Sequence, residues 1–355
     1  MIRFLFRRFV WFFITVFVVM SVSFFLMRSV KGGPFDGERA LDPNIKANIE
    51  ARYHLDWPLW KQFAQYVGPF NLDDDGPKLF VRDKEGFHLL KGARLFVSDE
   101  QGFRLVEADP GVDLFTGVLA GDFGPSFRYR DWTVNDIIAQ SLPISVLLGI
   151  VAMMWALSLG LSAGIASALR PGSKLDLGMR LAATGGIALP NFVIASFLII
   201  LLVFLIPLLP VAGWGSVQHM LLPGFCLGLV FAAYIARLTR TGMLEVLSQD
   251  YIRTAYAKGL APKTVVMRHA LKGGILPVVS YLGPATAGIL TGSLVIERIF
   301  FIPGTGSHFV NSATNRDYTL SMGVTILYTV LVYTLNTVVD LAYTFLDPRI
   351  SLEDE

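Results

Sequence analysis

The sequence predicts an all-α polytopic membrane protein with six transmembrane helices. Of its 355 residues, 53% are hydrophobic and only 16% are charged. That is too little charge to cover the surface of a soluble protein of this length. The apolar residues also come in long runs separated by polar stretches, and the basic residues gather in alternate loops, as they do in membrane proteins. The formal net charge of +2 is too small to suggest a nucleic acid partner.

Six apolar runs are long enough to cross about 30 Å of hydrocarbon, which needs about 20 helical residues. They are Phe9–Met27, Leu142–Leu169, Leu181–Ile206, Leu221–Met243, Leu276–Ile296 and Leu320–Phe345. Arg3, Arg7 and Arg8 precede the first run, as basic residues do in a signal peptide. We favour a retained helix, because the run is longer than the apolar core of a signal peptide and no convincing cleavage site follows.

The placement of lysine and arginine predicts that both termini are cytoplasmic. With the N-terminus inside, the loop after the second helix carries Arg170, Lys174 and Arg180 on the same side. The loop after the fourth helix adds Arg237, Arg240, Arg253, Lys258, Lys263, Arg268 and Lys272. The opposite loops, near 207–220 and 300–319, hold Arg316 alone.

The polar segment 31–135 predicts a small external α+β insertion, since long loops cross the membrane regardless of their charge. A near-repeat pairs Leu79–Phe87 with Leu95–Phe103, two apolar-turn-apolar units with a glycine in each turn. Two β-hairpins or a small meander are expected. Pro43–Gln65 predicts short amphipathic helices at the membrane surface. Whether the segment is a spacer or a docking domain stays open. The predicted divisions are 1–30, 31–135, a core 136–346 with a cytoplasmic loop 245–275, and a tail 347–355.

The loop between the fourth and fifth helices predicts a helix–turn–helix hairpin. Ser248 is a candidate N-cap, and Asp250 lies in the first turn, where negative charge is favoured. Gly259 fits the left-handed position after a helix, and Pro262 can begin the next one, over about 263–272. Gly273-Gly274 and Pro277 should then break the chain before the fifth helix.

This hairpin resembles the cytoplasmic signature loop of ABC importer permeases, which has the form Glu-Ala-Ala, three residues, Gly, and later Ile-x-Leu-Pro. Arg253-Thr254-Ala255 occupy the first positions, Gly259 the glycine, and Ile275-Leu276-Pro277 the end. Arg253 in place of Glu and the longer spacing resemble the dipeptide/oligopeptide/nickel branch, with its run Arg-Thr-Ala-x-Ala-Lys-Gly-Leu. Further elements of the chain resemble that branch: Gly121–Gly124 with Ser126, Ile302–Gly306, Asn315–Tyr318 and Asp347–Ile350. Residues 71–115 are expected to form a longer insert than such permeases usually have.

The resemblance implies a type I permease subunit of a peptide importer in the bacterial inner membrane. It implies a second related permease, two ABC ATPase subunits, an external substrate-binding protein and membrane lipid as partners. ATP and Mg would be bound by the ATPases, with no cofactor and no metal in this chain. Nickel or another small solute is an alternative cargo. The residues implied in coupling to the ATPase are Arg253, Thr254, Ala255, Tyr256, Ala257, Lys258, Gly259, Leu260 and Arg268.

The sequence contains no nucleotide-binding loop of the Walker A type, because glycine is nowhere followed directly by lysine. Candidate pathway or gate residues are the polar positions in or near the helices: Ser145, Asn191, Thr291, Ser293, Glu297 and Asn336. Pro190 predicts a kink beside Asn191. Asp340 is either a functional acid or a helix-packing partner.

Two other classes remain as alternatives. A secondary transporter would need buried charges near the middle of the membrane and often inverted repeats, whereas helices two to six are nearly free of central charge. A membrane-bound sensor using 31–135 as a ligand domain would not need the signature loop. The glycine pairs Gly160/Gly164 and Gly224/Gly228 are interpreted as helix-packing positions, and Cys226 as a small buried hydrophobe.

Overall fold

The computed structural model describes residues 2–29, 33–35, 49–51, 53–69, 72, 80–83, 86–89, 94–99, 102–107, 117–129, 131–210 and 212–346. Contacts within the chain separate two compact units. The first unit comprises Met1–Phe17, Gln140–Asn311 and Thr325–Glu355, and the second comprises Val18–Ala139 and Ser312–Val324.

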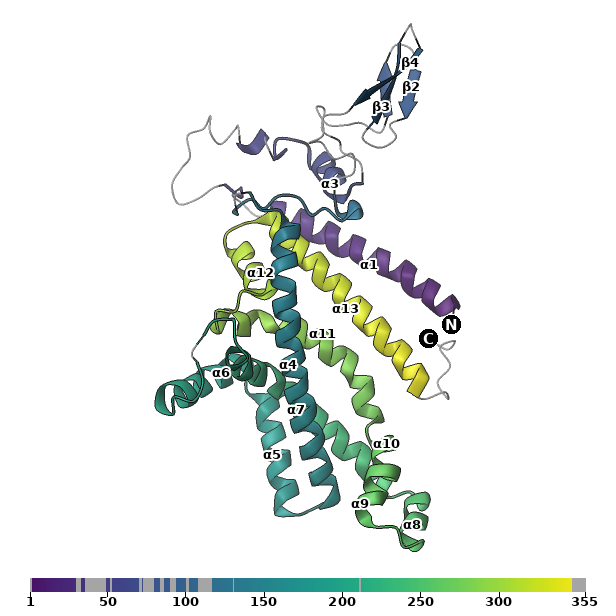
Figure 1. Cartoon of the computed structure of the whole chain (residues 1–355), viewed down its shortest axis with the longest axis vertical. Helices are drawn as coiled ribbons and strands as arrows, with labels where there is room; N and C mark the ends of the chain where they lie inside the picture. The colour runs from purple at the N-terminus through teal and green to yellow at the C-terminus, as the bar shows by residue number, and fades with distance from the viewer. Residues whose placement is uncertain are drawn as a thin grey trace. The chain divides into compact units, whose positions relative to one another are not determined.

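Four single helices are long and apolar enough to cross a membrane. They are α1 (Ile2–Ser29), α4 (Val134–Leu169), α7 (Gln218–Leu247) and α13 (Tyr318–Leu346) (Figure 1). Each contains one of the predicted apolar runs, extended by a few residues at its ends. Two bent pairs of helices pass the same test together, so the described residues provide four to six candidate spans.

The first bent pair corrects the prediction of one kinked helix over Leu181–Ile206. The structure has α5 (Lys174–Ala188) and then α6 (Asn191–Ile199), which continues as a π-helix over Ile200–Leu205. The two parts meet at 105°. Leu189 is extended (φ −90°, ψ 130°) because a residue before proline is pushed out of the helical region. The break is therefore a full corner.

The second bent pair leads into α11 (Leu276–Ile299), with a bend of 51° at Ile275. It is followed by the short helix α12 (Thr305–Thr314). The predicted fifth run, Leu276–Ile296, lies wholly within α11.

Glycines hold α4 and α7 together at close range in the first unit. A Cβ on Gly160 of α4 would lie 2.8 Å from the carbonyl oxygen of Ala232 in α7. A Cβ on Gly164 would lie 2.7 Å from the carbonyl oxygen of Ala236. A Cβ on Gly228 of α7 would lie 2.3 Å from the Ala152 carbonyl oxygen of α4. The predicted packing role of these glycine pairs is confirmed. Cys226, on α7 between Gly224 and Gly228, is fully buried, as predicted.

The second unit contains the two predicted β-hairpins. Strand β1 (Phe80–Asp83) pairs antiparallel with β2 (Gly86–Leu89), and β3 (Arg94–Asp99) pairs with β4 (Gly102–Glu107). Among the described residues they form separate two-stranded sheets, which favours two hairpins over a meander. The predicted strand residues Leu79 and Leu90 lie outside the described residues. Helix α3 (Leu59–Val67) provides one short helix near the predicted Pro43–Gln65 stretch, and a 3-10 turn covers Val118–Ala120.

Two sequence elements far apart in the chain meet in this unit. The Ser126 hydroxyl donates to the buried Asp317 carboxylate, which also accepts from the backbone N–H of Phe127 (3.2 Å). The Arg128 Nε donates to the carbonyl oxygen of Asn315 (2.8 Å). The segments Gly121–Ser126 and Asn315–Tyr318, both singled out in the sequence, therefore form one structural feature.

Candidate functional site

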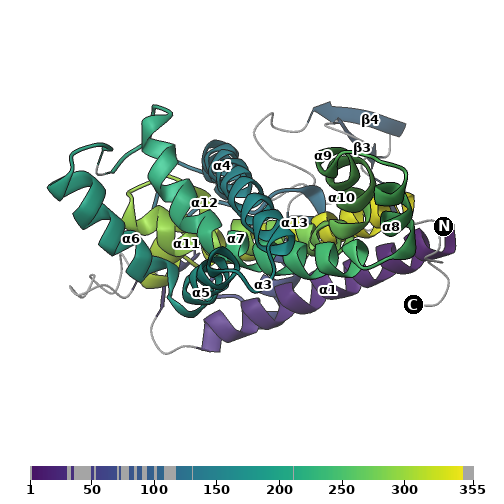
Figure 2. The same ribbon diagram turned by 90° about the horizontal axis from the view of Figure 1, so that it is seen from below.

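The predicted helix–turn–helix hairpin is present and begins with α8 (Asp250–Ala257). After a turn the chain continues as α9 (Pro262–Thr264), a π-helix over Val265–Ala270 and α10 (Leu271–Gly274). Figure 2 shows α8, α9 and α10 gathered together. Gly259 has φ +78°, the left-handed conformation predicted for it, and Pro262 starts the second arm as predicted.

One detail of the hairpin differs from the prediction. Ser248 is not the N-cap of α8, because α7 runs on to Leu247 and Ser248 forms its helical C-cap (φ −82°, ψ −10°). Gln249 takes the N-cap position, without a side-chain hydrogen bond. The predicted break before the fifth helix is confirmed, because α10 ends at Gly274 and the chain bends by 51° before α11. The missing side chain of Gly274 also leaves room for Met243 of α7, whose Sδ would lie 2.5 Å from a Cβ there.

The inner face of the hairpin is apolar and packed. The buried residues Ile252 and Ala255 of α8 join Val265, Val266 and Ala270 of the second arm. This cluster includes Met243 of α7 and Ala168 of α4. Burial of this face fixes both arms against the long helices, because packed interiors do not deform continuously. We call these residues, with Met243 and Ala168, the hairpin core.

The outer face of the hairpin is exposed and mixed in character. Large apolar side chains stand on it: Tyr251, Tyr256, Leu260 and Met267. Tyr256 is 44% exposed. Among the residues predicted to couple, Ala255 is buried in the hairpin core, whereas all the others lie exposed: Arg253, Thr254, Tyr256, Ala257, Lys258, Gly259, Leu260 and Arg268. Aromatic and apolar side chains rimmed by charge are typical of a surface that binds another protein.

A buried ion pair ties α5 to α7 beside the hairpin core. Asp176 has no exposed surface and accepts two hydrogen bonds from Arg240, Nε to Oδ1 at 2.7 Å and Nη2 to Oδ2 at 2.9 Å. It also accepts from the Ser167 hydroxyl and from the Gly172 N–H (2.9 Å). Such a bidentate pair sets orientation as well as distance.

A second buried polar cluster lies around Glu297 at the end of α11. Glu297 has no exposed surface, and its Oε1 accepts from the Ser145 hydroxyl (2.7 Å) while its Oε2 accepts from the Ser307 N–H (3.2 Å). The Ser145 hydroxyl also accepts from the Thr305 N–H (2.9 Å), and the Thr305 and Tyr328 hydroxyls lie 3.0 Å apart. We call these five residues the Glu297 cluster.

A glycine makes room for this carboxylate. A Cβ on Gly304 would lie 2.4 Å from Glu297 Oε2 and 2.5 Å from the Ser145 hydroxyl. The loop after α11 therefore closes directly over the acid, and a side chain at this position would push it away.

The other candidate pathway residues are dispersed. Ser293 is buried one turn before Glu297 on α11, and its hydroxyl donates to the Leu290 carbonyl (2.9 Å). Asn336 lines a different cavity of about 600 Å³, together with Arg8 and Tyr333. Asp340, on the same helix, forms an ion pair with Arg8, as its packing interpretation predicts. The side chain of Thr291 lies outside the described residues.

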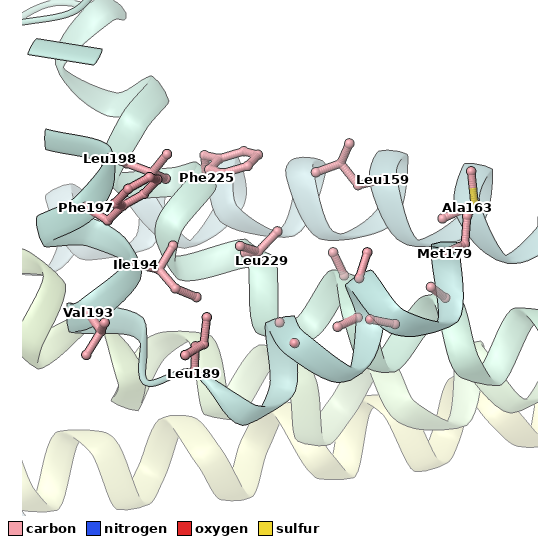
Figure 3. Close-up of a pocket in the computed structure, with 17 residues that line it drawn as sticks. Leu159, Ala163, Met179, Leu189, Val193, Ile194, Phe197, Leu198, Phe225 and Leu229 are labelled. Carbon is pink, nitrogen blue, oxygen red and sulfur yellow. The ribbon is translucent and has the colours of Figure 1, made fainter. Parts of the chain in front are cut away.

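Asn191 begins α6 beside an apolar cavity of the first unit. That cavity measures about 900 Å³ and is lined by apolar side chains and glycines of α4, α5, α6 and α7. Leu189 and Val193, which flank Asn191, are among them, together with Phe197, Phe225 and Leu229 (Figure 3). The labelled side chains contain no nitrogen or oxygen, so this lining has nothing to orient a polar cargo.

Sequence reasoning missed several members of these clusters. Thr305 was named only as part of a loop, and Tyr328 carries no local signal within its apolar helix. Arg240 was counted as one of several cytoplasmic basic residues, although its partner Asp176 is a lone acid between Lys174 and Arg180. A lone acid within a basic stretch was the available signal for an ion pair.

Comparison with known proteins identifies the family to which this sequence is similar. Residues 159–352 match the family described as "Binding-protein-dependent transport system inner membrane component". The chain belongs to this family. The part of this inner membrane component that matches contains the hairpin, the Asp176–Arg240 pair and all of the Glu297 cluster except Ser145.

Curated relatives match over nearly the whole chain. The "Oligopeptide transport system permease protein OppB" of Escherichia coli (strain K12) is 40% identical over 352 residues, 99% of each chain. The "Dipeptide transport system permease protein DppB" of Bacillus subtilis (strain 168) is 38% identical over 352 residues, again 99% of each. The expectation of an unusually long insert at 71–115 stays a prediction.

One solved structure supports the fold. A chain of the MetNI methionine ABC transporter, determined in inward-facing conformations, has a TM-score of 0.52 and 16% identity. The alignment covers 59% of this inner membrane component and 96% of that chain. At this identity the likeness concerns the fold alone.

Proposed function

We propose that this chain is the membrane-spanning permease subunit of an ATP-binding-cassette importer that moves peptides across the bacterial inner membrane. The family is one of binding-protein-dependent inner membrane components. Relatives that match over 99% of the chain are named as oligopeptide and dipeptide transport permeases. These names support peptides as the cargo.

The hairpin is the observation that carries the proposed mechanism. Its inner face is locked into the hairpin core, while its outer face presents Tyr256, Leu260 and basic side chains. A rigid body with an exposed binding face is what a lever needs. Partner ATPases, which bind ATP and Mg, dock on the outer face and rock the membrane helices, alternating access from one side to the other.

The proposed assembly contains this permease, a second homologous permease, two ATPase subunits and an external substrate-binding protein, embedded in lipid. Each bent pair counts as one span, which makes six. The basic loops 170–180 and 237–272 then lie in the cytoplasm with both termini. The segment 31–135 lies outside as an insertion between the first two spans.

We place the gate at the Glu297 cluster rather than at the apolar cavity of α4 to α7. Ser145 of α4 and Glu297 of α11 come together there, Thr305 joins them from the start of α12, and Ser293 is buried one turn before Glu297. Movement of α11 against α4 would break these hydrogen bonds. Asn191, Thr291 and Asn336 remain candidate pathway residues.

The test of the lever mechanism replaces Gly259, which forms the turn of the hairpin. A Cβ on Gly259 would meet nothing within 4 Å, so only the left-handed backbone opposes substitution. That conformation costs an L-residue about 1–2 kcal/mol, and more if it is β-branched. In the assembled importer in proteoliposomes, Gly259→Val should lower ATP-dependent peptide uptake by about fivefold or more.

Gly259→Asn is the matched control, because asparagine tolerates the left-handed region. It should retain most of the uptake, and both variants should insert into the membrane at native levels. Native uptake by Gly259→Val would refute the lever. Loss of uptake without loss of ATPase activity would place the defect in coupling.

A further inference from the structure

A pocket with charged side chains in its lining lies within the second unit and differs in this respect from the apolar cavity of the first. Its volume is about 270 Å³, and it is lined by the charged side chains Arg28 and Asp122 and by Gln62 and Tyr66. Sites for small molecules usually measure about 300–1,000 Å³. A ligand the size of an amino acid or a dipeptide would fill this one.

Arg28 is held in place from two sides. The amide nitrogen of the buried Gln62 donates to the carbonyl oxygens of Leu55 (3.1 Å) and Trp57 (2.7 Å). Its amide oxygen is therefore left to accept from the Arg28 Nε (2.7 Å). The guanidinium carbon also stands 3.9 Å from the centre of the Phe24 ring. These contacts restrict the guanidinium before any ligand arrives, which reduces the cost of binding.

No carboxylate among the described residues forms an ion pair with Arg28. A half-buried guanidinium without a counter-charge is unfavourable, since desolvation of its charge is not offset. Its terminal nitrogens have donors to spare, because its hydrogen bond to Gln62 uses only Nε. A planar fork of such donors matches a carboxylate in particular.

Tyr66 offers a second donor in the same pocket. Its hydroxyl is buried and has no hydrogen-bond partner within the described chain. Burial raises the pKa of Tyr66 above its ordinary value, so the phenol keeps its proton at physiological pH. A buried hydroxyl without a partner is uncommon and calls for an explanation, such as an absent ligand.

Asp122 brings the opposite charge to this pocket. Its Oδ1 accepts from the Gly124 N–H (2.8 Å), a local turn contact that leaves the carboxylate charge unneutralised. Asp122 and Arg28 line one pocket but form no ion pair with each other. Within the part of the chain that the structure describes, the pocket therefore holds one cation and one anion that each lack an ion-pair partner.

We propose that this pocket binds a small zwitterion of the amino-acid or dipeptide class, its carboxylate on Arg28 and Tyr66 and its ammonium group on Asp122. A simple anion would be repelled by Asp122, and a simple cation by Arg28. This site goes beyond the proposed function, which concerns the passage and its coupling to ATP.

The experiment measures equilibrium binding of radiolabelled dialanine to the full chain in phosphatidylcholine nanodiscs. Dialanine amide lacks the carboxylate, and N-acetyl-dialanine lacks the ammonium group. Dialanine should bind at least about tenfold more tightly than either analogue, since each has lost a charged hydrogen-bonding group. No ATPase is present, so this test can fail without bearing on transport.

Tyr66→Phe separates a ligand contact from a structural role. The hydroxyl has no partner to lose, so the melting temperature should stay the same or rise, while dialanine affinity falls about fivefold. Arg28→Gln should abolish binding. Arg128→Gln removes an arginine of the same unit that does not line the pocket, and it should bind dialanine as the native chain does.

Equal binding of dialanine and its amide, or undiminished binding in Arg28→Gln, would overturn the proposal. So would the absence of dialanine binding. Phosphatidylethanolamine also joins an oxyanion to an ammonium group. A further outcome is that the native chain retains this lipid and binds no dialanine, while Arg28→Gln retains none of the lipid. That result would show that the pocket binds a lipid headgroup and not a dipeptide.

Discussion

The contact between α4 and α7 predicts a large effect from the smallest possible substitution, Gly228→Ala. The new Cβ would lie 2.3 Å from the carbonyl oxygen of Ala152 and 3.2 Å from its carbonyl carbon. Ordinary contacts begin near 3.4 Å, so the two backbones would have to separate by roughly 1 Å. Neither atom is the end of a flexible side chain, and the strain therefore cannot be relieved by a rotamer change.

The change in the free energy of unfolding follows from two opposing contributions. Overpacking a tight interface costs about 1–3 kcal/mol, and a clash between backbones belongs at the upper end. Alanine recovers about 1 kcal/mol from its better helix propensity. Gly228→Ala should therefore lower the free energy of unfolding by about 2 kcal/mol. The neighbouring Trp155, whose Cβ would lie 3.3 Å from the new methyl group, offers a fluorescence signal for that interface.

Gly178→Ala is the matched control, because a Cβ there would meet nothing within 4 Å. It lies in α5 and should raise the free energy of unfolding by about 0.5–1 kcal/mol. Reversible denaturation in detergent measures both variants side by side. The same sign for the two substitutions, or a stability of Gly228→Ala equal to that of Gly178→Ala, would refute the close-packing argument.

Two further predictions concern charge. Asp176→Asn should lower the melting temperature clearly, because it removes the charge from the buried bidentate pair with Arg240, whereas Asp250→Asn should change it little. Asp250 is 95% exposed and its pair with Arg253 spans 3.4 Å, so equal effects of the two substitutions would contradict this ranking. Burial raises the pKa of Tyr66 above 10.0, so the unfolded chain ionises this phenol first and stability falls as the pH rises above about 10. Phenylalanine cannot ionise, so Tyr66→Phe should lose less stability than the native chain between about pH 9 and about pH 11, as measured by denaturation curves. Identical pH profiles of the two proteins would show that burial does not raise the pKa of Tyr66.

Sequence reasoning succeeded where local chemistry decides the structure. The apolar runs predicted α1, α4, α7, α11 and α13, because a length of about 20 apolar residues has few other uses. Gly259 and Pro262 were placed correctly because a left-handed corner and a first helical turn each favour one residue type. The hairpins followed from the spacing of short apolar segments around glycine turns.

Sequence reasoning failed where two neighbouring helices compete for the same residue or where packing sets an angle. Ser248 has the side chain of an N-cap, but α7 extends to Leu247 and takes this residue for its own end. Pro190 predicts that the helix is interrupted, but it does not determine the angle. The 105° angle between α5 and α6 depends on how α6 packs after the break.

The clusters were beyond prediction for a different reason. Ser145 and Glu297 were each chosen as polar residues in apolar surroundings, but they are 152 positions apart and nothing local pairs them. Asp176 and Arg240 are 64 positions apart, and each looks like an ordinary loop charge. Pairings of this kind are set by the packing of helices.

The arrangement around α7 indicates how a push on the hairpin would spread. Met243 of α7 belongs to the hairpin core, and Arg240, one turn earlier, holds Asp176 of α5. Gly228, three further turns back, lies against the backbone of α4. Each contact is either a packed apolar cluster, a bidentate ion pair or a direct backbone approach, and none of these stretches gradually. Displacement of the hairpin should therefore move α4, α5 and α7 together, and motion should be taken up at the corners, at Leu189–Pro190 and at Ile275, where the helical hydrogen bonding is already interrupted.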